Sequence, residues 1–200
     1  MKIRPVCLYD VNELVNVHTR AFPGFFLSFL GPRFLREFYS AFLHEDTGIA
    51  LVAEGLVDGR VLGFVVGTTQ PYGFFKRLLK RRWWAFCFAS IGALLRRPWI
   101  APRIFRALFY RGEPPQGPKR ALLSSVAVGP EQQGCGLGRV LVTEWVEEAR
   151  KRGVPGCYLT TDADNNDAVN RFYAKCGWRV ESTYVTPEGR KMNRYVLDFE

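Results

Sequence analysis

The segment Gln132–Val142, "QQGCGLGRVLV", contains three glycines within five residues, and an apolar run follows directly. The segment before it, "LLSSVAV" at 122–128, has the short β-rich composition of a buried strand. The segment after it, at about 137–152, repeats apolar residues at helical spacing and ends at Gly153. The sequence therefore predicts a strand, a glycine-rich turn and a helix, in that order.

The predicted helix has one apolar stripe, which we expect to pack against a sheet: Leu137, Leu141, Trp145 and Ala149. The start of a helix presents unpaired backbone N–H groups and the positive end of the helix dipole. Glycines let a phosphate approach such amides closely, so the turn is a candidate phosphate site. The alternative is an ordinary tight turn between a strand and a helix, and the glycines alone do not decide between the two.

Two common nucleotide-binding motifs do not fit this turn. It contains no Gly-Lys-Ser or Gly-Lys-Thr, which excludes a P-loop. Gly134, Gly136 and Gly138 are spaced as GxGxG, whereas the dinucleotide-binding Rossmann motif requires GxGxxG near the start of its βαβ unit. A Rossmann fold is therefore the weaker alternative.

The rest of the chain predicts a mixed α/β sheet. Near the N-terminus, Asp10 is a candidate N-cap for one amphipathic helix, and "PRFLREFYSAFL" predicts a second helix after a loop rich in aromatic residues. Two β-hairpins are expected, one of them around an Asp-Gly turn. The expected hairpin strands lie at 50–56 with 61–69, and at 179–185 with 192–199. Between the hairpins, the pattern predicts strands at 122–128 and 157–161 and helices at 137–152 and 166–176.

Length and composition limit the class of protein. A chain of 200 residues can bury a sizeable core as one domain, and we expect a single domain over 1–200. The five cysteines are scattered, and the N-terminus lacks the apolar core of a secretory signal, so a cytoplasmic location is expected. With two histidines and no CxxC pair, no metal site is expected. The longest nearly uncharged apolar run, 83–95, is shorter than the about 20 residues that a membrane-spanning helix needs.

Two motifs resemble those of one enzyme superfamily. Gln133-x-x-Gly136-x-Gly138, behind "SSVAV", is similar to the acyl-CoA signature of the GNAT superfamily of N-acyltransferases. The segment 166–178, "NDAVNRFYAKCGW", resembles that family's Asn-…-Phe-Tyr-x-x-x-Gly-Phe/Trp segment. The resemblance covers about 120–185 closely and the N-terminal helices and first hairpin more loosely. It implies a mixed, largely antiparallel sheet with flanking helices and a splayed parallel strand pair at the coenzyme A site.

The resemblance also implies how acetyl-CoA is held. The strand before the loop would pair with the pantetheine arm through Val126, Ala127 and Val128. The loop amides would hold the pyrophosphate, and they belong to Gln133, Gly134, Cys135, Gly136, Leu137, Gly138 and Arg139. Asn166 is expected both to cap the last helix and to contact the cofactor. The Cys135 thiol itself is expected to take no part.

Catalytic groups follow from the same resemblance. Acyl transfer from a thioester to an amine needs a neutral nitrogen, a stabilised oxyanion and a proton for the departing thiolate. Tyr173 matches the family's thiolate-protonating tyrosine, although Tyr173 also lies on an apolar helical stripe and could be a core residue.

The base is not assigned by the sequence. Where family members often carry a Glu on the strand before the loop, this chain has Ser124 and Ser125. Asp162, Glu54 and His18 are candidates, and each is also explained as a structural or solvated residue. A water relay would serve as well.

The charge of the chain is concentrated in an insertion at about 72–118, where the family usually has a short helix. Lys and Arg number 28 against 19 Asp and Glu, for a formal charge of +9, and ten basic residues lie between Phe75 and Gly112 without one acidic residue. Pro98 and Pro102 would divide the insertion into two helices. The insertion could bind an anionic membrane through its basic segment 76–111. It could instead form a lid over an anionic acceptor such as a nucleotide-linked amino sugar. A third interpretation is that it packs on the domain or on the second subunit of a homodimer. Nucleic-acid binding is less favoured, because no base-reading motif accompanies the charge.

Together these patterns predict a GNAT-like N-acetyltransferase that transfers an acetyl group from acetyl-CoA to a primary amine. The acceptor is expected to be an amino sugar or another small amine. No metal is expected to take part in the reaction. The reaction would occur in the cytoplasm or at the inner face of the membrane. The alternative from a different class is a non-catalytic module that docks on membranes or nucleic acid and has kept the fold.

Overall fold

One seven-stranded sheet organises the computed structural model, which describes residues 1–74, 77, 78, 80, 84, 86, 88 and 119–199. The strand order is β1-β2-β3-β4-β5-β7-β6. The strands are β1 (Lys2–Pro5), β2 (Gly48–Glu54), β3 (Val61–Thr68), β4 (Ala121–Val128), β5 (Gly156–Asp162), β6 (Arg179–Val185) and β7 (Lys191–Asp198). The helices are η1 (Leu8–Asp10), α1 (Val11–Ala21), α2 (Phe26–Phe29), α3 (Pro32–His44), η3 (Pro130–Gln132), α6 (Leu137–Lys151) and α7 (Asp167–Lys175).

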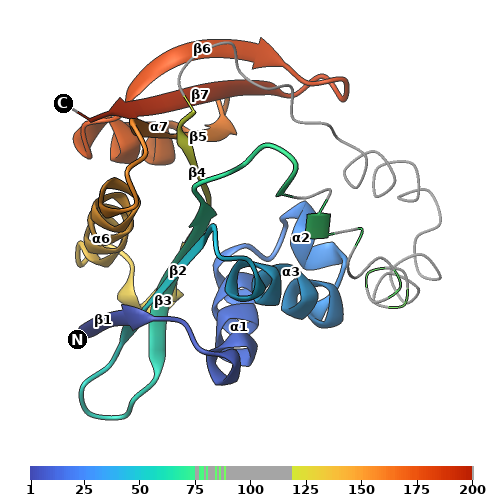
Figure 1. Cartoon of the computed structure of the whole chain (residues 1–200), viewed down its shortest axis with the longest axis vertical. Coiled ribbons are helices and arrows are strands. Elements are labelled where there is room, and N and C mark those ends of the chain that lie inside the picture. The colour runs from blue at the N-terminus through green and yellow to red at the C-terminus, as the bar shows by residue number, and fades with distance from the viewer. Residues whose placement is uncertain are drawn as a thin grey trace.

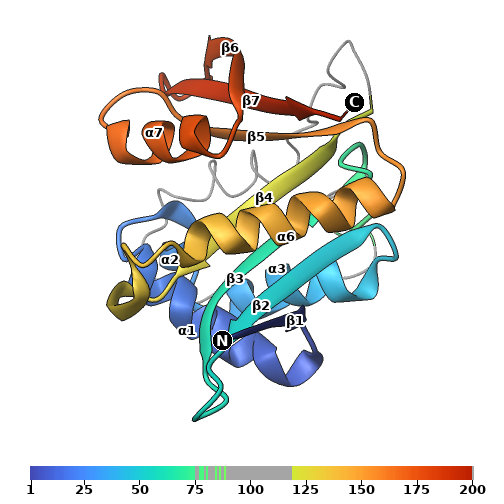
Figure 2. The same cartoon turned by 90° about the vertical axis from the view of Figure 1, so that its left-hand side faces the viewer.

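The central strands β4 and β5 are parallel, whereas every other neighbouring pair in this sheet is antiparallel. They pair only at Ala121 with Cys157 and Leu122 with Tyr158. Beyond these residues the two strands diverge, and Figure 2 shows β5 turning away from β4. The sequence-based expectation of a mixed, largely antiparallel sheet with a splayed parallel pair is therefore confirmed.

Helices cover the sheet on both faces. Figure 1 shows α1 and α3 on one side of the sheet, with α6 and α7 on the other. One apolar cluster joins α1 and α3 to the face that carries Phe64 and Val66. A second cluster joins α6 and α7 to the opposite face, which carries Val65 and Leu159. Both faces of the sheet are thus buried in the region that leads to the split between β4 and β5.

The apolar stripe predicted for α6 is its buried face. Leu141 and Trp145 are fully buried, and the Trp145 indole N–H donates to the carbonyl of Ile49 at 3.3 Å. Gly67 on β3 makes this close packing feasible, because a Cβ at that position would lie 2.3 Å from the Trp145 ring and 2.2 Å from the carbonyl oxygen of Leu122. Helix α6 is therefore seated directly on the sheet, which fixes the position of its N-terminus.

Most of the predicted elements are present, with bounds that differ by a few residues. Both hairpins form, as β2 with β3 and as β6 with β7. Strand β1 was not predicted from the sequence. Its four residues include Pro5 and show no alternation, and the strand exists because it pairs with β2 at the edge of the sheet.

The insertion predicted at about 72–118 falls largely outside the described residues, as do Pro98 and Pro102. Two of its described residues contact α3. The Phe74 and Phe86 rings lie 4.9 Å and 5.1 Å from the rings of Phe42 and Phe34. In the part of the chain that the structure describes, no helix has the length and apolarity needed to span a membrane.

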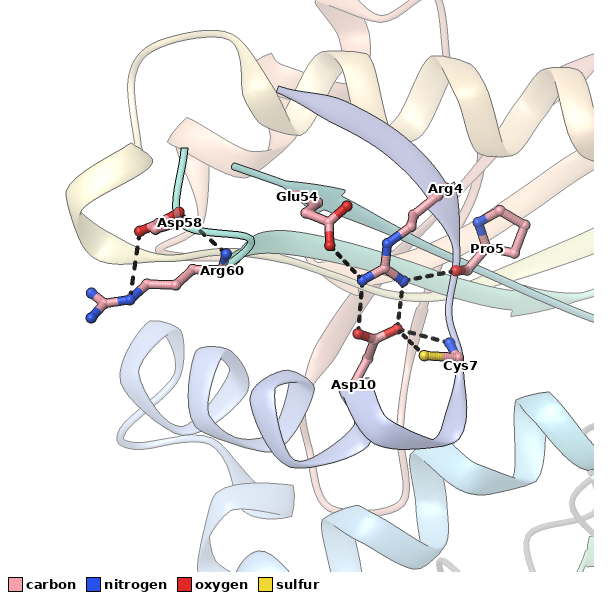
Figure 3. A network of polar contacts seen from close by, with 7 residues as sticks. All are labelled: Arg4, Pro5, Cys7, Asp10, Glu54, Asp58 and Arg60. Carbon is pink, nitrogen blue, oxygen red and sulfur yellow. Dashed lines mark hydrogen bonds and ion pairs between the residues drawn. The ribbon is translucent and has the colours of Figure 1, made fainter. Parts of the chain in front are cut away.

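A partly buried ion-pair network fastens the N-terminus to the sheet (Figure 3). The Arg4 guanidinium donates to both carboxylate oxygens of Asp10, at 2.7 Å and 2.9 Å, and to Glu54 at 3.0 Å. Asp10 also accepts hydrogen bonds from the Cys7 amide at 2.8 Å and the Cys7 thiol at 3.1 Å. Asp10 does precede α1, but its carboxylate makes no capping hydrogen bond to that helix. Asp10 therefore occupies the expected N-cap position but does not cap α1 with its side chain, because Arg4 and Cys7 occupy the carboxylate.

This network predicts a stability that depends on pH. The hydrogen bond from Arg4 lowers the pKa of Asp10 to about 2, from an ordinary value of 3.8. A carboxyl group whose pKa is lower in the folded state stabilises the fold at pH values above its pKa in the unfolded chain. This stabilisation is lost as the pH falls toward 2. We expect Asp10→Asn to lower the free energy of unfolding by about 1–2 kcal/mol at neutral pH, with a smaller difference near pH 2, as measured by urea titration.

The matched control is Asp58→Asn. Asp58 pairs with Arg60 at 3.5 Å in the β2–β3 turn, where both side chains are largely exposed (Figure 3). Exposed pairs contribute little, so we expect a change below about 0.5 kcal/mol at either pH. Equal losses in the two variants would contradict a special role for the Asp10 network.

Candidate active site

The free edge of β4 faces the split in the sheet. Val126 pairs with Val65, Ala127 with Phe64 and Val128 with Gly63, all on the β3 side. On the other side, the parallel pairing with β5 has already ended at Leu122. Among the described residues, the backbone of 126–128 therefore keeps unpaired hydrogen-bonding groups on one edge, apart from the Val128 carbonyl, which accepts from the Gln133 side chain. These groups are within reach of an extended chain that enters the split.

The glycine loop connects this edge to α6. The loop follows η3, and it turns at Gly134 and Gly136, which have φ angles of +81° and +84°. Only glycine adopts this left-handed region without strain. Gly136 is the N-cap of α6, and the Gln133 side chain donates to the Val128 carbonyl at 3.3 Å, which ties the loop to the end of β4.

Five consecutive amides of the loop have no acceptor among the described residues, and they belong to residues 134–138. The amides at the two ends of the predicted cradle are already used. The Gln133 N–H donates to Pro130 at 3.4 Å, and the Arg139 N–H donates to Gly136 at 3.0 Å. The loop thus offers five N–H groups at a helix N-terminus, an arrangement that suits a phosphate group.

Asn166 does not cap α7 with its side chain, although it occupies the N-cap position. Its amide instead donates to the Thr161 hydroxyl at 2.8 Å and to the Asp162 carbonyl at 3.1 Å. Asn170, one turn later, also donates to the Asp162 carbonyl, at 3.1 Å. Asn170 was missed from the sequence, and its spacing of four residues from Asn166 is the signal that could have indicated it.

Tyr173 is buried on α7, and its side chain is only 6% exposed. Its ring contacts the rings of Phe172, Trp178 and Tyr195, with centroids 5.1 Å, 6.1 Å and 5.8 Å away. Burial raises the pKa of the Tyr173 phenol above its ordinary value, so the hydroxyl keeps its proton at neutral pH. Within the described residues no side-chain hydrogen bond occupies this hydroxyl, which leaves its proton available to a bound molecule.

The three candidate bases lie in different environments. Glu54 belongs to the Arg4 network, and the hydrogen bond from Arg4 lowers its pKa. Asp162 forms an ion pair with Arg190 at 2.7 Å. His18 is 1% exposed, and burial lowers its pKa to about 4, so the imidazole is neutral at neutral pH. The described residues contain no group of three His, Cys, Asp or Glu side chains that could hold a metal ion.

Two further contacts lie beside the loop. Cys135 is exposed, and its thiol donates to the carbonyl of Gln132 at 2.8 Å. Arg20, near the end of α1, forms an ion pair with Glu131 in η3. This ion pair links the first helix to the short helix that precedes the glycine loop.

Comparison with known families and structures gives a consistent result. A model described as the acetyltransferase (GNAT) family matches residues 11–178. The fold is similar to the crystal structure of ribosomal-protein-alanine N-acetyltransferase from Brucella melitensis, with a TM-score of 0.62 at 17% identity. That comparison covers 100% of both chains.

Curated relatives match over shorter stretches. A mycothiol acetyltransferase from Nocardiopsis dassonvillei is 40% identical over 65 residues, which is 31% of this chain and 19% of the relative. A ribosomal protein bS18 alanine N-acetyltransferase from Escherichia coli K12 is 35% identical over 75 residues, which is 36% of this chain and 50% of the relative. This chain therefore spans between a fifth and a half of the length of these relatives.

Proposed function

The chain belongs to the GNAT family of acetyltransferases, and on that premise we propose that it transfers an acetyl group from acetyl-CoA to the primary amine of an acceptor. The observation that carries the proposal is the series of five amides at residues 134–138, which have no acceptor in the described part of the chain and lie next to the edge of β4 that faces the split. Together they offer donors for a pyrophosphate and a strand edge for an extended amide-containing arm. Acetyl-CoA has both features.

In this proposal each part of the site holds one part of the donor. The unpaired amides and the N-terminus of α6 bind the pyrophosphate, while Gln133 and Arg139 flank them. The backbone of Val126, Ala127 and Val128 pairs with the pantetheine arm. Asn166 orients the end of β5 through Thr161, so its contribution to the cofactor site is through that strand.

Tyr173 supplies the proton that the leaving group needs. The nitrogen attacks the thioester carbon, the new C–N bond forms, and the C–S bond breaks with its electron pair on sulfur. The Tyr173 hydroxyl is protonated because burial raises its pKa, and it donates to the thiolate. Solvent then returns a proton to the phenolate, and the nitrogen releases one, so the protons balance.

The acceptor must present a neutral primary amine, because only a neutral nitrogen can attack the thioester. The names of the two relatives refer to very different acceptors, mycothiol and a protein alanine. A panel of glucosamine, spermidine and an alanine-initiated peptide therefore samples amino sugars, polyamines and protein N-termini. Release of free thiol from acetyl-CoA with each amine is the assay.

The same assay separates the two classes of function. We expect thiol release that depends on both acetyl-CoA and one amine of the panel. If coenzyme A binds but no amine accelerates thiol release, and if liposomes or oligonucleotides bind instead, the non-catalytic docking module is favoured.

A membrane contact is a second candidate function, favoured by the ten basic residues between 75 and 112 and by two exposed aromatic residues. Trp84 is 53% exposed and Phe88 is 68% exposed. Cations and tryptophan both suit the headgroup layer of an anionic leaflet, where each basic residue contributes about 1 kcal/mol. The protein would then lie at the cytoplasmic face of the membrane.

We expect binding to anionic liposomes at low salt, weak binding at several hundred millimolar salt, and almost none to neutral lipid, because salt screens the charges. Replacing Arg81, Arg82, Arg96 and Arg97 with Gln should abolish sedimentation with liposomes while acetyl-CoA binding persists. If the wild-type protein ignores anionic liposomes at low salt, the membrane contact is wrong. Light scattering on the same samples shows whether the segment instead joins two copies of the chain.

A further inference from the structure

Ser125 lies at a bulge in β4 that changes the face to which the strand's side chains point. Val66 pairs with Ser125, but the next residue of β3, Gly67, pairs with Leu123, so Ser124 is an extra residue in β4. Leu123 packs in the cluster beneath α6, whereas Val66, opposite Ser125, packs in the cluster beneath α1 and α3. The bulge therefore turns Ser125 toward α1 and α3, at the point where β4 has lost its β5 partner.

Two buried polar side chains lie behind Ser125. The Tyr39 hydroxyl, on α3, is 2.6 Å from Nδ1 of His18 on α1. Burial raises the pKa of Tyr39, and a side-chain hydrogen bond with Ser125 opposes that rise. Tyr39 and His18 are each 1% exposed, and the Tyr39 ring packs 4.9 Å from the ring of Phe64 on β3. Register places Ser125 on the side of the sheet where Tyr39 is buried, and Tyr39 in turn contacts His18. The three residues therefore lead from the split in the sheet to the first helix.

The direction of these hydrogen bonds follows from the surroundings of His18. Nε2 of His18 is buried without a partner among the described residues. The rings of Phe22 and Phe25 lie 5.2 Å and 6.4 Å from the imidazole. An N–H among aromatic rings can keep a weak interaction with them, whereas a bare nitrogen lone pair there has none. We therefore assign the proton to Nε2, which leaves Nδ1 to accept from Tyr39.

With that assignment, each hydroxyl has one role. The Tyr39 O–H donates to His18, so the Tyr39 oxygen accepts from the Ser125 O–H. The Ser125 oxygen keeps its remaining lone pairs, and these can accept a hydrogen bond from a molecule in the split. An amine N–H is a suitable donor, whereas a thioester oxygen is not.

We infer that Ser125 Oγ binds the attacking amine by accepting a hydrogen bond from one of its N–H groups, and that Tyr39 and His18 are positioning residues for Ser125. The inference rests on the proposed acetyl transfer. Ser125 faces the side of α1 and α3, while Tyr173 lies in the cluster on the opposite face of the sheet. The amine would then approach from one face and the thiolate would be protonated from the other. As Ser125 holds the nitrogen, the C–N bond forms, the C–S bond breaks, and the nitrogen releases its proton to water.

The test compares variants of Ser125 with glucosamine, spermidine and an alanine-initiated peptide as acceptors. We expect Ser125→Ala to lower kcat/KM for the accepted amine about tenfold, the effect of one lost hydrogen bond, with an unchanged Kd for acetyl-CoA. Ser125→Thr keeps the hydroxyl and should retain most of the activity. Ser124→Ala changes the neighbouring residue of the bulge and should leave kcat/KM as in the wild type.

A double-mutant cycle tests the positioning role. Tyr39→Phe removes only the hydroxyl, and we expect the same tenfold loss as in Ser125→Ala and no further loss in the double variant, because both act through one contact. His18→Asn keeps an acceptor near Nδ1 and should exceed His18→Leu in activity. If Tyr39→Phe fails to fold, the comparison of Ser125→Ala with Ser125→Thr still decides whether the Ser125 hydroxyl binds the amine.

Two results would overturn the inference. One is wild-type kcat/KM in folded Ser125→Ala for every acceptor that the wild-type protein uses. The other is losses that multiply in the double variant. A wild-type protein that binds acetyl-CoA yet releases no thiol with any of the three acceptors would instead refute the proposed function, and this inference with it.

Discussion

Gly136→Val is expected to weaken the binding of coenzyme A by at least about 100-fold, which corresponds to about 2.7 kcal/mol. Gly136 has a φ angle of +84°, and a residue with a Cβ is strained there by about 1–2 kcal/mol. No described atom lies within 4 Å of a Cβ built at this position, so the valine side chain would extend into the open space beside the unpaired amides. The backbone strain and the occupied space would both weaken the binding of the pyrophosphate. Titration calorimetry measures the loss of affinity for coenzyme A.

Two controls separate the cradle from a general loss of stability. Gly153, just beyond the end of α6, also has a positive φ angle and open space around its Cβ, but lies about 25 Å away along the helix. Gly153→Val should therefore lower the melting temperature without changing the affinity. Gly138→Ala should be tolerated, because its Cβ would meet Phe172 at an ordinary 3.6 Å. Wild-type affinity in folded Gly136→Val would mean that the cradle is assigned wrongly.

Tyr173→Phe is expected to lower kcat by about 10- to 1,000-fold, as the removal of a general acid does. The affinity for coenzyme A and the melting temperature should stay nearly unchanged, because the ring keeps its contacts with Phe172, Trp178 and Tyr195. Stopped-flow detection of the released thiol measures the change directly.

Tyr195→Phe is the matched control for this substitution. Tyr195 packs in the same aromatic cluster, but its hydroxyl already donates to the Asn170 side chain at 2.9 Å. Its removal should cost about 1 kcal/mol of stability and leave kcat unchanged. Unchanged turnover in Tyr173→Phe would return that residue to a purely structural role in the core.

The part of the fold closest to the glycine loop was predictable from the sequence because its signals are local. The positive φ angles at Gly134 and Gly136, the apolar stripe of α6 and the Asp-Gly turn of the first hairpin all depend on residues that are near one another in the chain. Helix and strand periodicity then place the elements, and the order of the elements leaves few topologies for the sheet.

The rest depends on contacts between distant residues, which local patterns do not reveal. Asp10 precedes a helix and has the chemistry of a cap, yet Arg4 occupies its carboxylate because β1 pairs with β2. The same pairing places Glu54 beside Arg4. The bulge at Ser124 has no signature in "LLSSVAV", so the face to which Ser125 points could be known only from its register with Val66.

The most direct test of the proposed acetyl transfer follows both products in one sample. The protein is mixed with acetyl-CoA that carries an isotope-labelled acetyl group and with the panel amine that gives the fastest thiol release. Free coenzyme A and labelled amide are then quantified by mass spectrometry over time. We expect equal amounts of the two at every time point, with the label on the amine nitrogen. Coenzyme A that is released without labelled amide, or no release with any amine of the panel, would contradict acetyl transfer to an amine.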